Sequence, residues 1–422
     1  MTSVVAQAME AAAPDRSAAV ATRRFAGKRV AMVTFSPYPA DPRPRRAIDA
    51  LVSEGAHIDL ICLESEGAPR RESLPGVDVY RVPLKHPRRG KFEYGWRYGY
   101  FILTAAVRFA FGALRRRYDL VYVHNMPDIL VVSALGPKAF GAKVVLDLHD
   151  PMPELMMTIF GVGESSASVQ LLKGIEKWSI GVADLAVTVN RACERIFALR
   201  SCGREKIAVV MNAPDGQIFP FRPPQARATG EESGRKPFVI MYHGSLVERN
   251  GLDVAVDALA QIRDLVPAAE LRVFGPKTPF LERVMGTVKE KGLEDMVRYL
   301  GPRRLEDLVN EIADSDLGVI PNQRNAFTDI NTPTRIFEYL ALGKPVIAPS
   351  TPGIQDYFDE RSLLFFEAGN PRNLAEQIAF AYSHPREILE VARRGQAVYE
   401  QHTWQVERET LLSRIAAVLH EQ

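Results

Sequence analysis

The sequence has few cysteines, no long apolar run and almost no net charge. Its 422 residues include three cysteines, Cys62, Cys193 and Cys202, which are too few and too scattered for a disulfide framework or a cysteine zinc site. No stretch reaches the ~18 consecutive apolar residues of a membrane-spanning helix. The formal net charge of +2 gives no overall signal for nucleic acid as a partner. These absences favour a cytoplasmic globular protein.

The first 27 residues also lack a feature, the continuous apolar core of a signal peptide. They are rich in alanine and poor in large apolar groups, so we predict a disordered extension over 1–27. A transit peptide is the alternative, and Glu10 and Asp15 count against it. The remaining length suits two large domains, at about 150 residues each as a prior.

Near-continuous Val/Ile/Leu runs recur along the chain with helical patterns between them. Such runs are typical of strands covered on both faces, and hence of parallel, doubly wound sheets. A polar stretch rich in proline and glycine, 214–237, separates two series of runs and is predicted to be a linker. The first series is 29–35, 57–63, 77–82, 119–124, 142–148, 185–190 and 207–212, and the second is 238–243, 270–275, 296–301, 316–321, 344–349 and 362–367.

Neither series carries a complete G-x-G-x-x-G after its first strand. The nearest string, GVGESS at 161–166, lacks the final glycine and follows no strand. A nicotinamide or flavin dehydrogenase is therefore disfavoured.

The segment PTRIFEYLALGKPVIA (333–348) predicts a helix that starts at Pro333, with Thr332 as its N-cap. Free N–H groups and the positive end of the helix dipole form an anion site there, and Arg335 adds donors suited to phosphate. Glu338, one turn later, is within reach of ribose hydroxyls. The alternative is an ordinary helix–strand unit in which Arg335 and Glu338 form a solvated pair.

Polar residues at predicted strand ends mark three further places, because ligands bind at the carboxyl ends of strands in open α/β sheets. His124 closes one strand, and His149 and Asp150 follow the next. Gly244 and Arg249 follow the first strand of the second series, where the glycine lets the backbone approach a phosphate. A structural role is the alternative for each histidine.

Together with 333–348, the strings YHGSLVERNGLDVAVDAL (242–259), LRVFGP (271–276), VRYLGPRRLEDL (297–308) and DSDLGVIPN (314–322) resemble the family-4 retaining glycosyltransferases of the GT-B fold. The resemblance runs from about Lys28 to the C-terminus. It implies an α/β protein with two Rossmann-like doubly wound domains facing a cleft. It further implies an acceptor domain at 28–213, a nucleotide-sugar domain at 238–402 and a helix at 403–422 that crosses back to the N-terminal domain.

The resemblance also implies an activity, the transfer of a hexose from a nucleoside-diphosphate sugar to a saccharide or lipid-linked acceptor in cell-surface polysaccharide or lipopolysaccharide assembly. No cofactor or metal is expected, since the helix start and arginines replace an ion. The resemblance implies a front-face transfer in which the leaving diphosphate helps to deprotonate the acceptor. The implied catalytic residues are His124, His149, Asp150, Arg249 and Arg335, and the implied donor-binding residues are Gly244, Ser245, Arg249, Asp329, Asn331, Thr334, Arg335 and Glu338.

Three positions depart from the common family pattern. Ser245 and Asn250 stand where many relatives have basic residues, and Ile330 stands where many have an acid. Asp329 or Asn331 is expected to take over the hexose contact. The alternatives are a GT-B nucleotide-sugar epimerase or hydrolase, and a catalytically silent nucleotide-sugar-binding protein. Asp314 and Asp316 of the DSD string are read as turn and capping residues rather than metal ligands.

Residues 81–117 form a basic segment rich in aromatic residues. It carries ten basic residues against the single acid Glu93. This mixture is typical of a helix that lies on an anionic membrane surface, and the alternative is a core helix with a solvated basic edge. A membrane contact predicts a polyprenyl-diphosphate-linked saccharide as acceptor and a peripheral position at the cytoplasmic membrane face. The residues are Arg81, Lys85, Arg88, Arg89, Lys91, Arg97, Arg108, Arg115, Arg116 and Arg117, interleaved with Phe92, Tyr94, Trp96, Tyr98, Tyr100, Phe101, Phe109 and Phe111.

Overall fold

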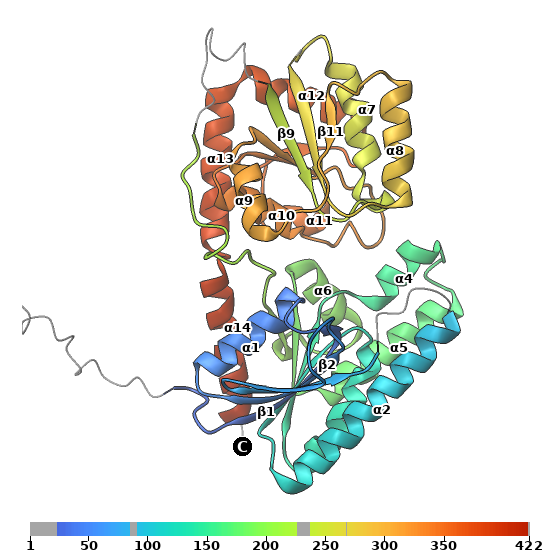
Figure 1. Cartoon of the computed structure of the whole chain (residues 1–422), viewed down its shortest axis with the longest axis vertical. Coiled ribbons are helices and arrows are strands. Elements are labelled where there is room, and N and C mark those ends of the chain that lie inside the picture. Colours follow the sequence, from blue (N-terminus) through green and yellow to red (C-terminus); the bar gives the residue numbers. More distant parts are fainter. Residues whose placement is uncertain (1–22, 85–90, 226–236, 267, 421–422) are drawn as a thin grey trace, which may run out of the picture.

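A computed structural model describes residues 23–84, 91–225, 237–266 and 268–420. The chain forms two α/β halves that face one another, each with helices on both sides of a largely parallel sheet (Figure 1). The predicted α/β class with two doubly wound sheets is confirmed. Residues 1–22 of the predicted extension (1–27) and residues 226–236 of the predicted linker (214–237) lie outside the described residues.

The N-terminal sheet has the strand order β3-β4-β2-β1-β5-β6-β7-β8. All neighbouring pairs are parallel except β3 with β4. The strands whose apolar runs predicted them are largely buried, as expected for strands covered on both faces. Their bounds are β1 Arg29–Pro37, β2 His57–Leu63, β3 Arg71–Leu74, β4 Val77–Val82, β5 Leu120–His124, β6 Lys143–Leu148, β7 Leu185–Thr188 and β8 Ile207–Val209.

Two apolar clusters fill the two faces of this sheet. One is covered by α2, η1, α5 and α6, and the other by α1 and the last helix of the chain, α14. The helices are α1 Pro42–Ser53, α2 Lys91–Arg115, η1 Asp128–Ala134, α3 Leu135–Ala139, α4 Met152–Phe160, α5 Ala167–Val182, α6 Arg191–Arg200, η2 Arg204–Lys206 and α14 Trp404–His420.

The C-terminal sheet is fully parallel, in the order β11-β10-β9-β12-β13-β14. Its strands are β9 Phe238–His243, β10 Ala269–Phe274, β11 Val297–Tyr299, β12 Leu317–Val319, β13 Val346–Pro349 and β14 Leu364–Phe366. Its helices are η4 Glu248–Asn250, α7 Leu252–Ile262, α8 Pro279–Glu290, α9 Leu305–Ala313, α10 Thr334–Ala341, α11 Pro352–Gln355, α12 Pro371–Ser383 and α13 Pro385–Glu400. The helices again pack on both faces.

Two segments connect the halves on the same side of the molecule (Figure 1). The first is the segment that follows β8 and leads to β9, and the second is the segment that joins α13 to α14. They touch each other, since the Gln396 side chain of α13 donates a hydrogen bond of 2.7 Å to Arg222 O. Leu411, Leu412 and Ile415 of α14 are buried against the N-terminal sheet, which confirms the predicted crossing helix.

Two local features differ from the prediction. Phe25, placed in the disordered extension, is buried against the N-terminal core, and the Phe25 N–H donates to Glu54 O. A single aromatic residue between Arg24 and Ala26 gives no periodic pattern, so the sequence did not indicate its burial. Strand β3 was missed because its residues, RESL, are mostly exposed and lack an apolar run.

In both sheets the order of the strands reverses at or beside a strand at whose end polar site residues were predicted. Strand β1 lies between β2 and β5, and β9 lies between β10 and β12. Crevices at such switch points bind ligands in open α/β sheets. Among the described residues, no helix is sufficiently long and apolar to cross a membrane.

Leu412 tests the crossing helix. Its side chain is fully buried in α14, so Leu412→Ala is expected to lower the free energy of unfolding by about 2–5 kcal/mol. Val406→Ala is the control, since the exposed Val406 of the same helix should shift stability by no more than about 0.5 kcal/mol. Urea unfolding followed by circular dichroism measures both. Equal effects would show that α14 is not anchored through Leu412.

Candidate functional site

The C-terminal side of the site begins where β9 ends at His243. Gly244 follows with φ of +123°, and a Cβ atom on it would lie 3.3 Å from Cδ of Arg335. The glycine therefore allows the turn after β9 to pass close to the first turn of α10. The structure thus brings together two residues that are 91 positions apart in the sequence.

Arg335 is fixed in place by backbone and side-chain acceptors. One Nη donates to His243 O at 2.7 Å, and the other donates to Asn322 Oδ1 at 3.2 Å. The guanidinium also lies 5.0 Å from the centre of the Tyr242 ring. These bonds use two of the five guanidinium N–H groups, so an anion beside Gly244 can take up others without moving the side chain.

Glu338 pairs with His243 rather than with Arg335. Its Oε2 lies 2.6 Å from His243 Nε2. The Tyr339 hydroxyl donates to Met241 O at 2.7 Å, so it accepts from Nδ1 of His243 at 2.9 Å. The Nδ1 hydrogen of His243 therefore points to the Tyr339 hydroxyl, and the Nε2 edge of the ring faces the Glu338 carboxyl group. The alternative reading, a solvated pair of Arg335 and Glu338, is wrong, because the two side chains bind other partners.

The start of α10 differs from the prediction in one detail. Pro333 occupies the N-cap position and the helix begins at Thr334. Thr332, predicted as the N-cap, donates its hydroxyl proton to Gly353 O at 2.8 Å instead. No described side chain caps the first turn of α10, and the anion site at this helix start stays a prediction.

Ser245 and Asn250, which depart from the family pattern, support the turn after β9. The carbonyl of Ser245 accepts from the Tyr242 hydroxyl at 2.8 Å and from Asn250 Nδ2 at 2.8 Å. Arg249 contacts the loop that follows β12. Its carbonyl accepts from Gln323 N, and its guanidinium lies 5.9 Å from the centre of the Phe327 ring.

Ile330 faces the other half of the molecule. Its carbonyl accepts from Asn190 Nδ2 at 2.9 Å, and its side chain packs against the N-terminal core. Its neighbour Asp329 is bound to Arg324 Nε at 3.1 Å. Asn331 follows, partly buried, with its N–H directed to Thr328 O. Ile330 therefore serves packing between the halves, and the acid of the family pattern has no equivalent at this position.

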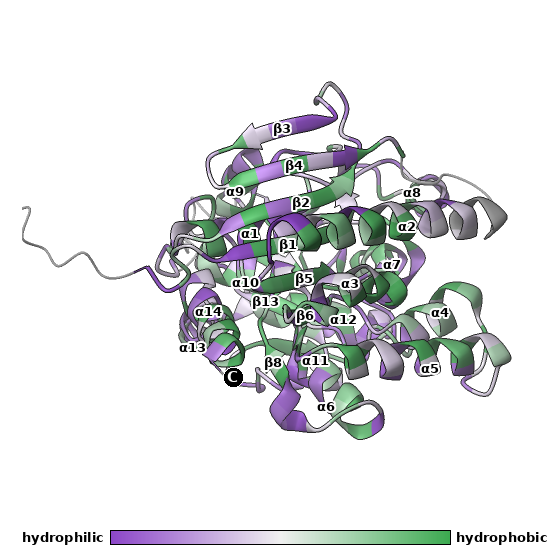
Figure 2. Cartoon of the chain, turned by 90° about the horizontal axis from the view of Figure 1, so that it is seen from below, coloured by the Kyte–Doolittle hydropathy of each residue, from purple (hydrophilic) through white to green (hydrophobic). Residues whose placement is uncertain are grey.

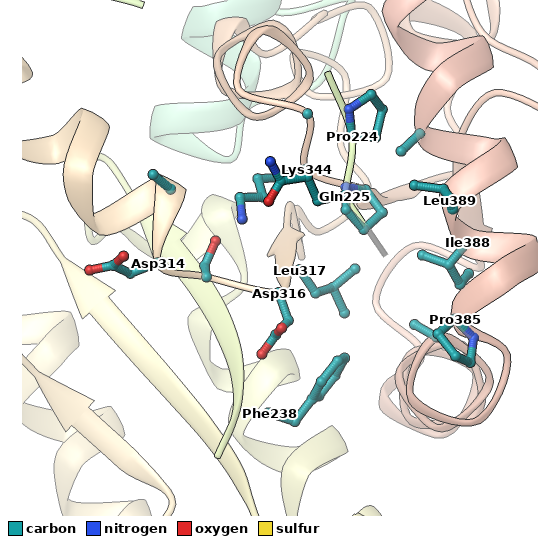
Figure 3. Close-up of a pocket in the computed structure, with 16 residues that line it drawn as sticks. Pro224, Gln225, Phe238, Asp314, Asp316, Leu317, Lys344, Pro385, Ile388 and Leu389 are labelled. Carbon is teal, nitrogen blue, oxygen red and sulfur yellow. The ribbon is translucent and has the colours of Figure 1, made fainter. Parts of the chain in front are cut away.

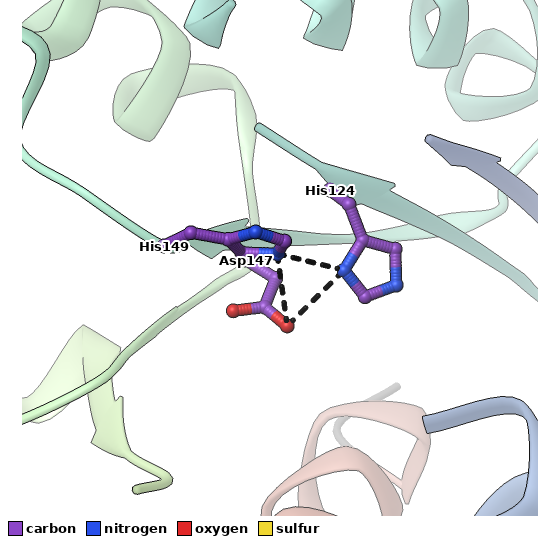
Figure 4. Close-up of side chains that lie close together, drawn as sticks. All are labelled: His124, Asp147 and His149. Carbon is purple, nitrogen blue, oxygen red and sulfur yellow. Dashed lines mark hydrogen bonds and ion pairs between the residues drawn. The ribbon is translucent and has the colours of Figure 1, made fainter. Parts of the chain in front are cut away.

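The N-terminal side of the site is arranged around Asp147, the next-to-last residue of strand β6. Asp147 Oδ1 accepts from Nε and Nη2 of Arg43 at 2.9 and 2.6 Å, and Oδ2 accepts from the Tyr122 hydroxyl at 3.0 Å. His124 Nδ1 lies 3.3 Å from the same Oδ2 (Figure 4). Burial alone would raise the pKa of Asp147, but Arg43 and the His124 bond hold that pKa well below its usual range.

The two predicted histidines touch one another. His124 Nδ1 and His149 Nε2 are 3.1 Å apart (Figure 4). Removal from water lowers the pKa of His149 to about 3, with Asp147 opposing and Arg43 adding to the shift. His149 is therefore neutral near pH 7 and acts as a hydrogen-bonding group, since so acidic an imidazolium has a weakly basic conjugate.

A buried amide holds the loop that carries His149 and Asp150. Asn125 Oδ1 accepts from His149 N at 2.7 Å, and its Nδ2 donates to Asp150 O at 3.3 Å. The same Nδ2 donates to Asp128 Oδ1 at 2.7 Å. Burial raises the pKa of Asp128 to about 7; the Asn125 bond opposes this, Glu176 adds to it and Arg200 also opposes it.

Asp150 brings the two halves into electrostatic contact. Burial raises the pKa of its carboxyl, and the positive charge of Arg249 from the C-terminal half is the largest opposing influence. The predicted residues thus gather from both halves. His124, His149 and Asp150 lie on one side, and Gly244, Arg249, Arg335 and Glu338 on the other.

Two acidic groups bear on the question of metal binding. His124, Asp147 and His149 offer ligand atoms within 4.8 Å of one another, but Arg43 occupies Asp147 and its charge opposes a cation. Asp314 and Asp316 line a separate pocket of about 220 Å³ with Lys344 and Phe238 (Figure 3). Phe238 begins β9, whereas Gly244 follows the end of that strand. Asp316 Oδ2 accepts from Val239 N at 2.8 Å. The absence of metal from the reaction stays a prediction.

Five site residues were missed by sequence reasoning: Arg43, Tyr122, Asn125, Asp147 and His243. A signal existed for Asp147, since it is a carboxylate inside the apolar strand KVVLDL, and for His243, which directly precedes Gly244. Arg43 gave no local signal, because its partner lies 104 positions away.

Asp128 predicts a pH dependence of stability. Its folded-state pKa of about 7 exceeds the ordinary 3.8, so the native protein retains a proton that the unfolded chain loses between these values. Stability therefore falls as pH rises through that window, and Asp128→Asn removes this loss.

The melting temperature of Asp128→Asn relative to wild type is expected to be higher at pH 8 than at pH 5. The exposed Asp295→Asn controls for the change of charge. An identical difference at both pH values would show that Asp128 does not titrate between them.

Comparison with known proteins identifies the family. Residues 40–213 match the glycosyl transferase 4-like domain, and residues 237–384 match glycosyl transferases group 1. A putative colanic acid biosynthesis glycosyltransferase, WcaL, of Escherichia coli is 28% identical over 202 residues, covering 47% of this chain and 48% of its own. The chain spans about half the length of the curated relatives it matches first. A D-inositol 3-phosphate glycosyltransferase of Saccharomonospora viridis is 23% identical, covering 82% of this chain and 81% of its own.

Solved structures share the fold. A sucrose-phosphate synthase of Thermosynechococcus elongatus superposes with a TM-score of 0.73 at 18% identity, covering 94% of this chain and 100% of its own. HepE of Anabaena, solved in complex with UDP, superposes with a TM-score of 0.66 at 16% identity, covering 92% and 100%. The predicted resemblance is confirmed, and the chain belongs to the group 1, or family 4, glycosyltransferases of the GT-B fold.

Proposed function

We propose that this glycosyltransferase moves a hexose from a nucleoside-diphosphate sugar, with retention and without a metal, to a saccharide or polyprenyl-diphosphate-linked acceptor. The observation that carries the proposal is the fixed position of Arg335 beneath Gly244, beside the first turn of α10. Solved structures of HepE contain UDP or UDP-glucose. A uridine diphosphate sugar is therefore the first donor to test.

The diphosphate of the donor would rest on the first turn of α10. The N–H groups of this turn and the remaining donors of Arg335 suit phosphate oxygens. Glu338, one turn further, is held by His243 and presents its second oxygen to the ribose hydroxyls. Gly244 permits the close approach, because a side chain there would press against Arg335.

The chemistry follows from where charge develops. The bond from the anomeric carbon to the phosphate oxygen breaks, a bond to the acceptor oxygen forms on the same face, and the acceptor proton passes to the leaving phosphate. Negative charge on the leaving group grows, and Arg335, Arg249 and the start of α10 stabilise it. No metal is needed to carry this charge.

The N-terminal half would position the sugar and the acceptor. Neutral His149 and buried His124 are hydrogen-bonding groups, because Asp147 and Arg43 fix their surroundings. Asp150 follows the end of β6, where Asn125 binds its carbonyl, and Arg249 of the other half acts on its carboxyl group. We assign this carboxylate the role of orienting an acceptor hydroxyl. The colanic acid and inositol phosphate relatives make a saccharide or a phosphorylated polyol the acceptors to test first.

A panel of nucleotide sugars tests the donor. A ligand at ~100 times its Kd stabilises the fold by about 2.7 kcal/mol, so the true donor should raise the melting temperature by several degrees. Hydrolysis of that donor, measured with and without acceptor, then separates an enzyme from a silent binding protein. A panel in which no nucleotide sugar shifts the melting temperature would contradict the proposal.

Arg335 and Glu338 test the two ends of the donor site. Arg335→Ala is expected to lower kcat by roughly 10²–10³-fold, the cost of removing one donor to a developing anion. Glu338→Gln is expected to weaken nucleotide binding with a smaller change in kcat, because it contacts the ribose and not the reacting bond.

The control is Arg372→Ala, which removes an arginine whose side chain is 84% exposed on α12. Steady-state kinetics and calorimetric titration of the nucleotide distinguish the effects, and chelation of divalent ions should change neither. Unchanged kcat in Arg335→Ala, or activity lost on chelation and restored by Mg²⁺, would contradict the proposed roles.

A further inference from the structure

Helix α2 is apolar on two opposite faces. Phe101, Ala105 and Phe109 point inward and are almost fully buried against the N-terminal sheet. On the outer side, large apolar side chains are exposed, with Trp96 at 66% and Leu103 at 63%. We name these residues the outer stripe: Trp96, Tyr100, Leu103, Val107, Phe111 and Leu114.

The outer stripe is continuous along the helix. Successive members are separated by three or four residues, so at 100° per residue all six fall within an arc of about 80°. This arc lies opposite the buried face that Phe101, Ala105 and Phe109 define. A helix of a monomeric protein normally presents polar residues there, so the stripe indicates a surface that is covered in use.

Neighbouring helices extend the apolar surface. In α5, Leu171 and Trp178 are exposed two turns apart, opposite the buried Val169 and Ile180. Helices α2 and α5 run along the lower right side of the N-terminal half, and Figure 2 shows apolar residues along α2, α3 and α5 (Figure 1). Leu135, Phe140, Ile159 and Phe160 are the exposed apolar residues of the adjoining α3 and α4 region.

The charge beside the stripe is positive. Between residues 94 and 117 the chain has five arginines and no acid. A groove of about 840 Å³ runs between α2 and the β4–β3 edge, lined by Val107 and Phe111 and by Arg108, Arg115 and Arg116. Its three carboxylates already have partners, since Asp59 contacts Arg29, Glu72 contacts Arg81 and Asp78 contacts His57.

The structure corrects part of the sequence-based description of this segment. Arg81 is buried and bound to Glu72, so it adds nothing to the basic surface. Phe101 and Phe109 belong to the core, and Tyr98 packs on Phe35. Lys85, Arg88 and Arg89 lie outside the described residues. The exposed part is the outer stripe with Arg115, Arg116 and Arg117.

We propose that the outer stripe of α2 and the exposed face of α5 dock this protein onto an anionic membrane surface. Trp and Tyr are suited to the interface between headgroups and acyl chains, and arginines at the end of α2 can contact lipid phosphates. A second copy of the chain fits this surface less well. A two-fold contact would place the arginines of one copy near those of the other, and the outer stripe has no carboxylate to offset their repulsion. The proposal deepens the lipid-linked acceptor of the proposed function, yet its test needs no donor.

Co-sedimentation with vesicles tests the apolar contact. The full chain should bind vesicles of phosphatidylglycerol and phosphatidylcholine at low salt, and pure phosphatidylcholine vesicles much less. Leu103→Glu with Phe111→Glu should reduce binding at least about tenfold. Leu103 and Phe111 would be buried in the membrane, and the two charged replacements would resist that burial. The matched control is Leu265→Glu with Leu305→Glu, which changes two exposed leucines of the C-terminal half and should leave binding unchanged.

Three arginines test the charge contact. Replacing Arg115, Arg116 and Arg117 with Gln should reduce binding to the anionic vesicles on the order of a hundredfold at low salt, at roughly fivefold per residue, and high salt should reduce wild-type binding too. The control replaces Arg304, Arg361 and Arg372, three exposed arginines of the C-terminal half, with Gln.

Three results would overturn the proposal. The first is a wild-type protein that stays in the supernatant with anionic vesicles at low salt. The second is an equal loss of binding in the stripe and control variants. The third is a concentration-dependent dimer that binds no vesicles and that Leu103→Glu with Phe111→Glu abolishes, which would make a second copy the occupant. Nucleotide affinity measured on the same variants should equal that of wild type, so a failed donor assay and a failed docking assay are separable.

Discussion

The buried contact between Arg43 and Asp147 organises the side of the cleft contributed by the N-terminal half. The two groups meet at 2.6 Å with their side chains almost fully buried, and Tyr122 and His124 occupy the second carboxylate oxygen. An ion pair of this kind adds little net stability compared with apolar packing, but removing one partner typically costs about 3–5 kcal/mol because the other charge stays buried. It fixes the electrostatic surroundings of both histidines.

The same arginine also reaches the chain where it leaves the N-terminal half. Arg43 Nη1 donates to Val210 O at 3.0 Å and to Asn212 Oδ1 at 2.9 Å. Met211, which lies between these two residues, donates its N–H to the Glu407 carboxylate at the start of α14, at 2.7 Å. Both segments that connect the halves are therefore attached to the histidine cluster. Geometry at the acceptor side and at the connections is set by one network rather than by two.

The sequence predicted features that depend on neighbours in the chain. Buried apolar runs located thirteen strands and both sheets. A glycine after a strand and a predicted helix start singled out Gly244, Arg335 and Glu338, and Gly244 and Arg335 lie side by side in the structure. Pairings between distant residues were hidden, since nothing in the sequence near Arg43 or His243 indicates Asp147 or Glu338. For α2, the aromatic residues were visible but their directions were not, because both the buried and the exposed face carry large apolar residues. Thr332 shows that a capping residue can lose its role to a tertiary acceptor.

The two connecting segments lie together on one side of the molecule, and this limits how the halves can move. Sliding and twisting would strain both segments at once, so the remaining freedom is a rotation about the line on which they lie. Displacement then grows with distance from that line. Helix α4 lies on the far side in Figure 1, where Thr158 donates to Asn325 Oδ1 at 3.1 Å, so a small rotation separates this pair more than the contacts near α13. Because it lies far from the rotation axis, the hydrogen bond between Thr158 and Asn325 is sensitive to the angle between the two halves.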